Sequence, residues 1–529
     1  MDNKKSTITD HLEDGFSHGQ YAPVISYDNK GISGIIRSPY VFGAALLASF
    51  GGFSFGYDQG VVSLILTLPQ FHQQFPEIAP GHPRYGFNTG FMTGMLEFGA
   101  FVGCIFFPLL ADRYSRIWGL AVATVFFCVG AIIQTASHNY GTLVAGRTIG
   151  GIGVGTLAMG APLYISEIAP PNLRGSLLVL EAISMVVGAI IAYWITYGTR
   201  EIASDWSFRL PFILQMVPAL VVGIGIQFFP CSPRWLAMRH RDEDSLQSLE
   251  RLRRLPRTDG RVQQEWKGIL REVELQELVL HREHGAHTNF VVLEFKQWGD
   301  LFKPKYLRRT TVALAIPFFQ QFSGINAFVY YAPIFFAALG QSYEMSLILS
   351  GMVNICQFVA GIPTFLFLDK MGRRKLAIFG GIAMGIPHII MAGVVSKYNK
   401  WESSPGIGWF GVALIYIYVL AYASSYGPLA WTLPAEIFPS SKRAKGVGAA
   451  TAMVWLANFI IGVIVPEMQL KLGWGTYLFF GCFCFAASIF SFFFVPETAG
   501  KSLEQIAGIF GDSLEDEERE LETHAAEEA

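Results

Sequence analysis

The chain has 529 residues, of which 52% are hydrophobic and only 15% are charged, and its formal net charge is −2. A water-soluble protein of this length needs far more charge to cover its surface, so the composition excludes a soluble globular class and predicts a polytopic membrane protein. The small net charge is uninformative, because basic connections and an acidic C-terminal tail cancel each other.

Twelve apolar segments are long enough to cross a bilayer, which takes roughly 17–25 residues each. They begin near residues 40, 89, 118, 141, 175 and 208 and, after a polar interval, near 310, 344, 375, 408, 444 and 473. We therefore predict an all-α membrane protein with twelve transmembrane helices in two six-helix bundles, formed by residues 37–230 and 308–496.

The polar remainder divides into three parts. We expect residues 1–36 to be a disordered tail, residues 231–307 to be a helical linker, and residues 497–529 to be a tail with an acidic end. Within the linker, leucines recur every three residues from Leu246 to Leu255, and a second amphipathic face runs from Val262 to Val273. These patterns predict short helices packed under the bundles.

Basic residues crowd alternate connections, including the linker, whereas the connections between them are poor in Lys and Arg. The positive-inside rule then places both termini in the cytoplasm. None of the six cysteines lies in an outer connection, so we predict no disulfide framework.

One carboxylate stands out in the first span. The stretch from Val41 to Leu66 carries no charge except Asp58, and a lone acid in a membrane segment marks a functional site such as a proton relay by default. The alternatives are a structural ion pair or an acid at the end of a helix.

The two halves of the chain repeat three signatures in the same order. LADRYSR ends at Arg116 and LDKMGRR ends at Arg374; an acid then precedes an arginine by seven residues in each half, and PCSPRW and PETAGKSLEQI follow the sixth and twelfth spans. Positive-inside anchoring explains the arginines but not the matched acids. We predict a cytoplasmic latch formed by Asp112, Arg116, Glu167, Arg174, Asp369, Arg373, Glu436 and Arg443.

A duplicated six-helix unit implies two bundles that rock about a central site, which is the alternating-access arrangement. The segment GRTIGGIGVG, from Gly146 to Gly155, supports close helix packing in the fourth span. A dinucleotide-binding interpretation fails, because this segment does not follow a strand in a βαβ unit.

From about residue 40 to 507 the chain resembles the sugar porter family of the major facilitator superfamily, and within it fungal monosaccharide transporters. The motifs that carry the resemblance are GYDQG, GRTIGGIGVG, PLYISE, PCSPRWL, QQFSGINAFVYYAP, DKMGRR, GPLAWTLPAEIFP and PETAGKSLEQI. Together they are highly specific.

The resemblance implies a sugar site lined by amides and an aromatic ring, which suits the hydroxyls and the apolar face of a sugar. The residues implied are Gln320, Gln321, Asn326, Gln357, Trp431 and Asn458, with Tyr330 and Tyr331 as the outer gate. On one continuous seventh helix, Gln320 or Gln321 would share a face with Asn326. Amides that only join helices are the alternative, and Asn354 could substitute for Gln357.

The chain also departs from the family pattern. Ala182 and Val454 stand where relatives often carry amides, so two hydroxyl contacts are absent. A missing hydrogen bond of this kind costs about 1–3 kcal/mol, so we expect the preferred sugar or its affinity to differ from the commonest hexose pattern. Hexoses, pentoses and a sugar acid are all left open. Pro108, Ser115 and Cys231 replace usual latch residues, which predicts an altered first latch.

Arg147 matches the family position that pairs with Asp58. A carboxylate held between an arginine and a buried environment can become proton-responsive when its access changes. We therefore expect Asp58 and Arg147 to couple protons to transport, although some facilitators of the family keep the aspartate and transport without protons.

These observations predict a plasma-membrane importer of a monosaccharide that acts in symport with protons. A proton-independent uniporter and a sugar sensor are the alternatives. No arrangement of residues suggests an enzyme, a cofactor or a metal site, and isolated His388 is expected to be a packed histidine. The expected partners are the monosaccharide, protons and the lipid bilayer, without nucleic acid, and we expect a functional monomer.

Overall fold

The computed structural model describes residues 38–170, 173–285, 290–398, 405–439, 441–501 and 503–510. All regular elements in these ranges are helices, and they contain twelve spans that are long and apolar enough to cross a membrane. The predicted all-α architecture with twelve spans is confirmed. The tail predicted for residues 1–36 and the acidic end of the chain from Ser513 lie outside the described residues.

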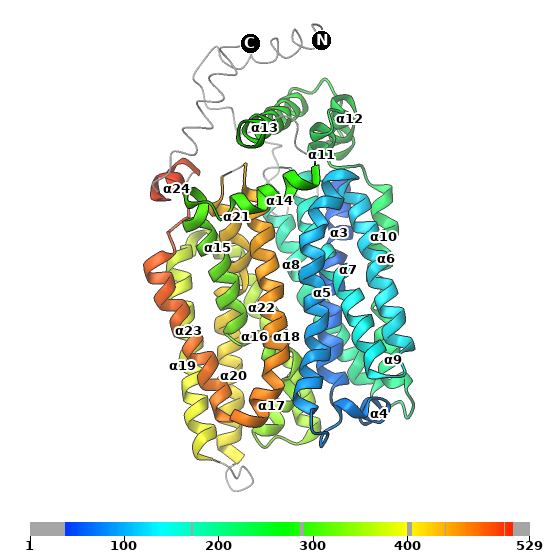
Figure 1. Cartoon of the computed structure of the whole chain (residues 1–529), viewed down its shortest axis with the longest axis vertical. Coiled ribbons are helices and arrows are strands. Elements are labelled where there is room, and N and C mark those ends of the chain that lie inside the picture. The colour runs from blue at the N-terminus through cyan, green and yellow to red at the C-terminus, as the bar shows by residue number, and fades with distance from the viewer. Residues whose placement is uncertain are drawn as a thin grey trace.

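The first six spans form one bundle (Figure 1). They are α3 (Pro39–Ile65), α5 (Tyr85–Arg113), α6 (Arg116–Ala136), α7 (Tyr140–Ile168), α8 (Arg174–Thr199), and α9 (Trp206–Leu214) with α10 (Met216–Gly225) and the turn η2 (Ile226–Phe228). The short α4 (Pro69–Gln74) and η1 (Pro76–Ile78) lie at one end of this bundle, which we call the α4 end.

The last six spans form the second bundle beside the first (Figure 1). They are α15 (Pro304–Phe322) with α16 (Ile325–Tyr330), α18 (Tyr343–Met371), α19 (Arg373–Lys397), α20 (Pro405–Ala423) with α21 (Tyr426–Ile437), α22 (Arg443–Leu472) and α23 (Trp474–Phe494). The short α17 (Ala332–Ala338) connects α16 to α18.

The remaining helices lie at the opposite end of the molecule, which we call the linker end (Figure 1). They are α11 (Pro233–Met238), α12 (Asp242–Arg253), α13 (Gly260–His284), α14 (Phe290–Asp300) and α24 (Leu503–Phe510). The predicted amphipathic faces pack against each other, because Leu246, Leu249 and Val262 form a small buried core with Leu255 and Trp266 beside it.

Local sequence signals fix several helix starts. The side chain of Asn139 accepts a hydrogen bond from the Thr142 backbone N–H at 2.9 Å and caps α7, and Ser115 caps α6 in the same way. Proline occupies the first position of α3 and α15, where its missing N–H costs nothing. These helices therefore begin close to the positions that the apolar segments predict.

Glycines let the helices of the first bundle touch through their backbones. A Cβ on Gly56 of α3 would overlap the carbonyl of Met185 on α8, and one on Gly151 of α7 would overlap the Leu96 carbonyl on α5. The glycines of α7 therefore allow the close approach that the sequence predicts. This packing holds α3, α5 and α7 close together around Asp58 and Arg147.

The seventh span is broken rather than continuous. Gly324 has a φ of +98° between α15 and α16, and a Cβ there would lie 2.7 Å from the Phe480 ring. A ring N–H of buried His388 donates to the Ser323 carbonyl at 3.1 Å, which satisfies a group at the break. The seventh helix is therefore not continuous between Gln320 and Asn326, but Asn326 still meets Gln321 through a hydrogen bond, as the sequence predicts.

The two bundles contact each other directly toward the α4 end. The Tyr193 hydroxyl on α8 donates to the Leu347 carbonyl on α18 at 2.6 Å, and Arg200 lies 3.0 Å from Glu344. At the linker end, the nitrogen of Lys445 on α22 lies 4.0 Å from an Asp112 oxygen on α5. The conformation is thus closed toward the α4 end.

A buried ionic cluster fastens the linker helices to the second bundle. The Lys442 ammonium, just before α22, lies 2.7 Å from Asp300 on α14 and also pairs with Glu283 on α13. Burial alone would raise the pKa of Asp300, but hydrogen bonds from Lys303, Lys442 and His284 outweigh it and hold the pKa at about 2.

The α3–α8 contact generates a stability prediction. Gly56→Ala should destabilise the protein by at least about 1–3 kcal/mol, because the added methyl group overlaps the Met185 backbone. Gly43→Ala on the same helix is the matched control, since the nearest atom to its Cβ is a Phe229 ring carbon at 3.8 Å. Melting curves of the purified protein check this, and equal melting temperatures for both variants would contradict the packing.

The Asp300 cluster generates a pH prediction. A carboxylate with a lowered pKa contributes stability above its unfolded value near 4 and loses it as the pH falls toward 2. Asp300→Asn should therefore cost about 1.5–3 kcal/mol at pH 5–8, with a smaller difference from wild type below pH 4. Glu243→Gln, whose side chain is 87% exposed, is the control. A melting-temperature difference that stays constant down to pH 3 would refute this role.

Candidate functional site

An ion pair lies buried in the first bundle. The two terminal nitrogens of Arg147 on α7 lie 3.4 and 3.3 Å from the two carboxylate oxygens of Asp58 on α3, and both side chains are about 1% exposed. Arg147 also donates to the Met92 carbonyl at 2.9 Å and to the Thr93 carbonyl at 3.5 Å, both on α5. Asp58 and Arg147 are thus brought together as the sequence predicts, and the arginine has further acceptors.

A second polar group lies next to this pair and joins the two bundles. The Tyr330 hydroxyl on α16 donates to Glu97 on α5 and accepts from Gln59 on α3 at 3.0 Å and from Asn458 on α22 at 3.2 Å. All four side chains are buried. Tyr330 and Asn458 are therefore placed beside the ion pair, at the contact between the bundles.

Sequence reasoning missed Glu97. It is 1% exposed and faces Asp58 and Arg147, so it belongs to the same charged region. The signal that could have found it is the one that pointed to Asp58, a lone acid within an apolar span. Another acid within a span, Glu181 of α8, lies against Gly52 of α3.

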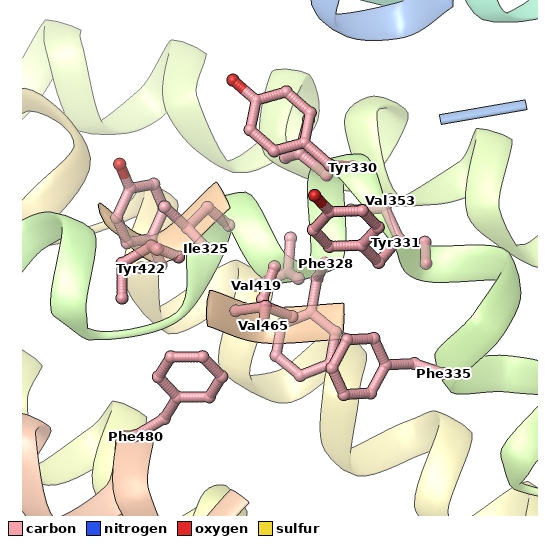
Figure 2. Close-up of a cluster of buried hydrophobic side chains, with 14 of the residues drawn as sticks. Ile325, Phe328, Tyr330, Tyr331, Phe335, Val353, Val419, Tyr422, Val465 and Phe480 are labelled. Carbon is pink, nitrogen blue, oxygen red and sulfur yellow. The ribbon is translucent and has the colours of Figure 1, made fainter. Parts of the chain in front are cut away.

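The two tyrosines of the predicted gate occupy the end of the short helix α16. Figure 2 shows Tyr330 and Tyr331 in a buried cluster with Phe328 and Phe335. The Tyr331 hydroxyl donates to the Gly462 carbonyl of α22 at 2.7 Å, within the second bundle. Tyr330 thus bonds to Gln59 and Glu97 of the first bundle, whereas Tyr331 bonds to Gly462 of the second and also lies next to Thr93 of α5.

The three amides of the seventh span form a chain at the helix break. Asn326 donates to Gln321, and Gln321 donates to Gln320 at 3.3 Å. Gln320 in turn donates to the carbonyls of Tyr426 and Gly427 on α21 at 3.1 and 3.2 Å. The structure brings these residues together, and in this conformation they join α15, α16 and α21.

Gln357 and Trp431 differ from these amides because they are not fully buried. Gln357 on α18 is half-buried and its amide nitrogen has no hydrogen-bond partner among the described residues. Trp431 on α21 is 36% exposed. Asn354, the possible substitute for Gln357, is buried on α18. The Gln357 amide nitrogen is itself buried, so Gln357 offers an unpaired donor and Trp431 a partly exposed indole ring, which are the features that a polar ligand with an apolar face needs.

The predicted latch residues form two ion-pair groups, one in each bundle. Arg116 lies 3.0 Å from Glu167 and 2.7 Å from Asp112, and Arg373 lies 2.7 Å from Glu436. Both groups lie at the linker end, where these helices meet (Figure 1).

The other three predicted latch residues are Arg174, Arg443 and Asp369. Arg174 begins α8, and within the described residues no ion pair joins it to Glu167. Arg443 begins α22, and the side chain of Asp369 lies outside the described part.

Among the described residues, one group of side chains could hold a metal ion. The ligand atoms of Glu283, His284 and Asp300 lie within 4.8 Å of one another. The Lys442 ammonium binds two of these carboxylates, so the group fits a salt-bridge cluster better than a cation site.

The chain is similar to known sugar transporters over most of its length. The model of the family "Sugar (and other) transporter" matches residues 44–510. The high-affinity glucose transporter of Kluyveromyces lactis is 32% identical over 90% of this chain and 85% of its own length. Sugar carrier protein C of Ricinus communis is 29% identical over 89% and 90% of the two chains. Both relatives are described as transporters or carriers, not as enzymes.

Solved structures agree with this comparison. The proton:xylose symporter XylE, bound to 6-bromo-6-deoxy-D-glucose, is 27% identical, covers 89% of this chain and 99% of its own, and has a TM-score of 0.72. The inward-open xylose transporter XylE from E. coli covers 89% and 100% of the two chains at 26% identity, with a TM-score of 0.69. With a family match across nearly all of its twelve spans, the chain belongs to the sugar transporter family of the major facilitator superfamily.

Proposed function

We propose that this protein imports a monosaccharide, a hexose or a pentose, across the plasma membrane in symport with protons. The observation that carries the proposal is the buried pair between Asp58 and Arg147. The proposal further places both termini and the linker helices in the cytoplasm, so that the α4 end faces outward. A single chain with two bundles supplies the site, which suits a functional monomer.

The geometry of the pair favours a proton-dependent switch. Its nitrogen–oxygen distances of 3.3 and 3.4 Å exceed the roughly 2.7–2.9 Å of a strong charge-assisted bond. When Asp58 takes up a proton, Arg147 keeps its bonds to the carbonyls of Met92 and Thr93. The arginine is therefore not left unpaired, which lowers the cost of breaking the pair.

Alternating access follows from where the bundles touch. Direct contacts such as Tyr193 with Leu347 and Tyr330 with Gln59 close the α4 end, and the opposite state requires these contacts to separate. The ion-pair groups at the linker end lie within each bundle, so they can keep helix ends together while the bundles rock. A proton crossing a potential of 100 mV contributes about 2.3 kcal/mol, or roughly fifty-fold accumulation.

The sugar would bind between the amide chain of the seventh span and the open side chains of α18 and α21. In the present conformation Gln320, Gln321 and Asn326 satisfy one another, so a bound sugar must exchange some of these bonds. Gln357 and Trp431 offer a donor and a ring without such exchange. A proton-independent uniporter would use the same sugar site with Asp58 permanently paired.

Asp58→Asn tests the coupling. We expect it to abolish accumulation of sugar above the outside level while leaving measurable counterflow exchange, because the isosteric amide cannot exchange a proton. Uptake by transporter-null cells, with a panel of hexoses and pentoses and with or without a protonophore, measures this. Asp205→Asn is the control, since that side chain is 51% exposed outside the bundle interior. An unchanged accumulation ratio in Asp58→Asn, or wild-type uptake that ignores the protonophore, would overturn symport.

Gln357→Leu tests the sugar site. Loss of one hydrogen bond to a bound sugar costs about 1–3 kcal/mol, so the apparent KM should rise roughly 5- to 150-fold with a smaller change in maximal rate. Gln341→Leu, before the start of α18, serves as the matched control. A KM equal to that of wild type would remove Gln357 from the binding site.

A further inference from the structure

The carboxyl group of Glu97 has no role in the function described above. It lies on α5 in the second span, 1% exposed, and its charged neighbours are Asp58 and Arg147. The other titratable groups facing it are the hydroxyls of Tyr330 and Tyr331. A buried acid at this place needs a reason, because such groups are costly in a membrane segment.

The site has two carboxyl groups but only one guanidinium group. Two ionised carboxylates, Asp58 and Glu97, would share the single guanidinium of Arg147 and leave one buried negative charge. An uncompensated buried ion costs several kcal/mol, whereas a neutral carboxyl group does not carry that cost. Arg147 is bonded to Asp58, so Glu97 is the group that this closed conformation favours as a neutral acid.

The hydrogen bonds around Glu97 agree with a proton on it. Tyr330 donates its only hydrogen to one oxygen of Glu97, and the hydroxyl is already saturated by donors from Gln59 and Asn458. Within the described residues, the second oxygen of Glu97 is buried without a hydrogen-bond partner. An ionised oxygen that is buried and unpaired costs more than a neutral one, so this arrangement agrees with a protonated carboxyl group.

The hydrogen bonds around Glu97 also join the two bundles at the contact that must open during alternating access. Glu97 and Gln59 belong to the first bundle, whereas Tyr330 and Asn458 belong to the second. Helices α5 and α22 pack closely there, since a Cβ on Gly94 would lie 3.1 Å from the Phe459 carbonyl. Opening the α4 end separates these partners and admits water to Glu97, where a carboxyl group ionises at ordinary pH.

We propose that closing of the α4 end takes up a proton at Glu97, and that the neutral carboxyl group then ties α5 to Tyr330 and Asn458. The proton comes from water on the α4 side and returns there on reopening, so it sets the ease of closing without adding to the coupled proton. This inference rests on the alternating access proposed above, but it does not require symport through Asp58.

Sugar exchange in proteoliposomes tests this with Asp58 intact, because Asp58→Asn would remove the partner of Arg147 and favour an ionised Glu97 beside it. Raising the pH on the α4 side from 5 to 8 should slow exchange. Because closing takes up one proton, its equilibrium constant falls by up to about tenfold for each pH unit. Adding Glu97→Gln, which mimics the neutral acid, should remove this dependence and keep exchange at the low-pH rate. Equal pH dependence with and without Glu97→Gln would overturn the proposal.

A distance measurement keeps the test independent of these variants. Spin labels on exposed Gln73 of α4 and Tyr343 of α18, with Glu97 and Asp58 intact and accessible cysteines replaced, report the separation of the bundles at the α4 end. The open population should grow between pH 5 and pH 8. An unchanged distance distribution over this range would overturn the role of Glu97 even if symport holds.

Two tyrosine variants complete the comparison. Tyr330→Phe removes the hydroxyl bonded to Glu97 and should favour the open distance at both pH values. Tyr331→Phe removes a hydroxyl that donates to the Gly462 carbonyl and not to Glu97, and it should keep the pH response. A reversed pattern would contradict the assignment. Loss of the protonophore effect in wild-type uptake, with these responses intact, would instead refute only the coupling through Asp58.

Discussion

The buried contact between Asp58 and Arg147 is the interaction on which the rest of this account depends. It places opposite charges on two helices of one bundle, where neither group reaches water in the closed conformation. A glycine of α3 lets these two helices approach closely, since a Cβ on Gly51 would lie 3.1 Å from the Ala161 side chain of α7. The tight packing of the first bundle is therefore part of the charge arrangement, since it fixes where the arginine can go.

The second bundle approaches this pair through one side chain. Tyr330 extends from the short helix α16, which follows the break at Gly324, and bonds to Gln59 and Glu97 of the first bundle. The amides next to the same break bond to one another, and Gln320 bonds to α21. One interruption in the seventh span thus links the predicted sugar site to the contact that closes the α4 end. Sugar binding and closure are coupled mechanically if the amides rearrange on binding.

Much of this could be predicted from the chain alone. Twelve apolar segments predicted the spans, and an isolated acid pointed to Asp58, because both signals are local in sequence. Its partner Arg147 was predicted only through the resemblance to the sugar porter family, since the pairing of two helices is not a local signal. The break at Gly324 was not anticipated, since helical spacing assumes a continuous helix and glycine alone does not predict an interruption. Glu97 has the same local signal as Asp58, but its bond to Tyr330 depends on how two bundles pack. The exposure of Gln357 and Trp431 likewise depends on the conformation that the bundles adopt.

The most direct test of the account is whether sugar carries protons with it. Purified protein in sealed liposomes containing a pH-sensitive dye is given an inward sugar gradient without an initial pH difference or membrane potential, and internal pH is followed. The account predicts acidification of the lumen that follows sugar entry and that is absent with Asp58→Asn. Sugar entry at the wild-type rate with no change in internal pH would contradict it.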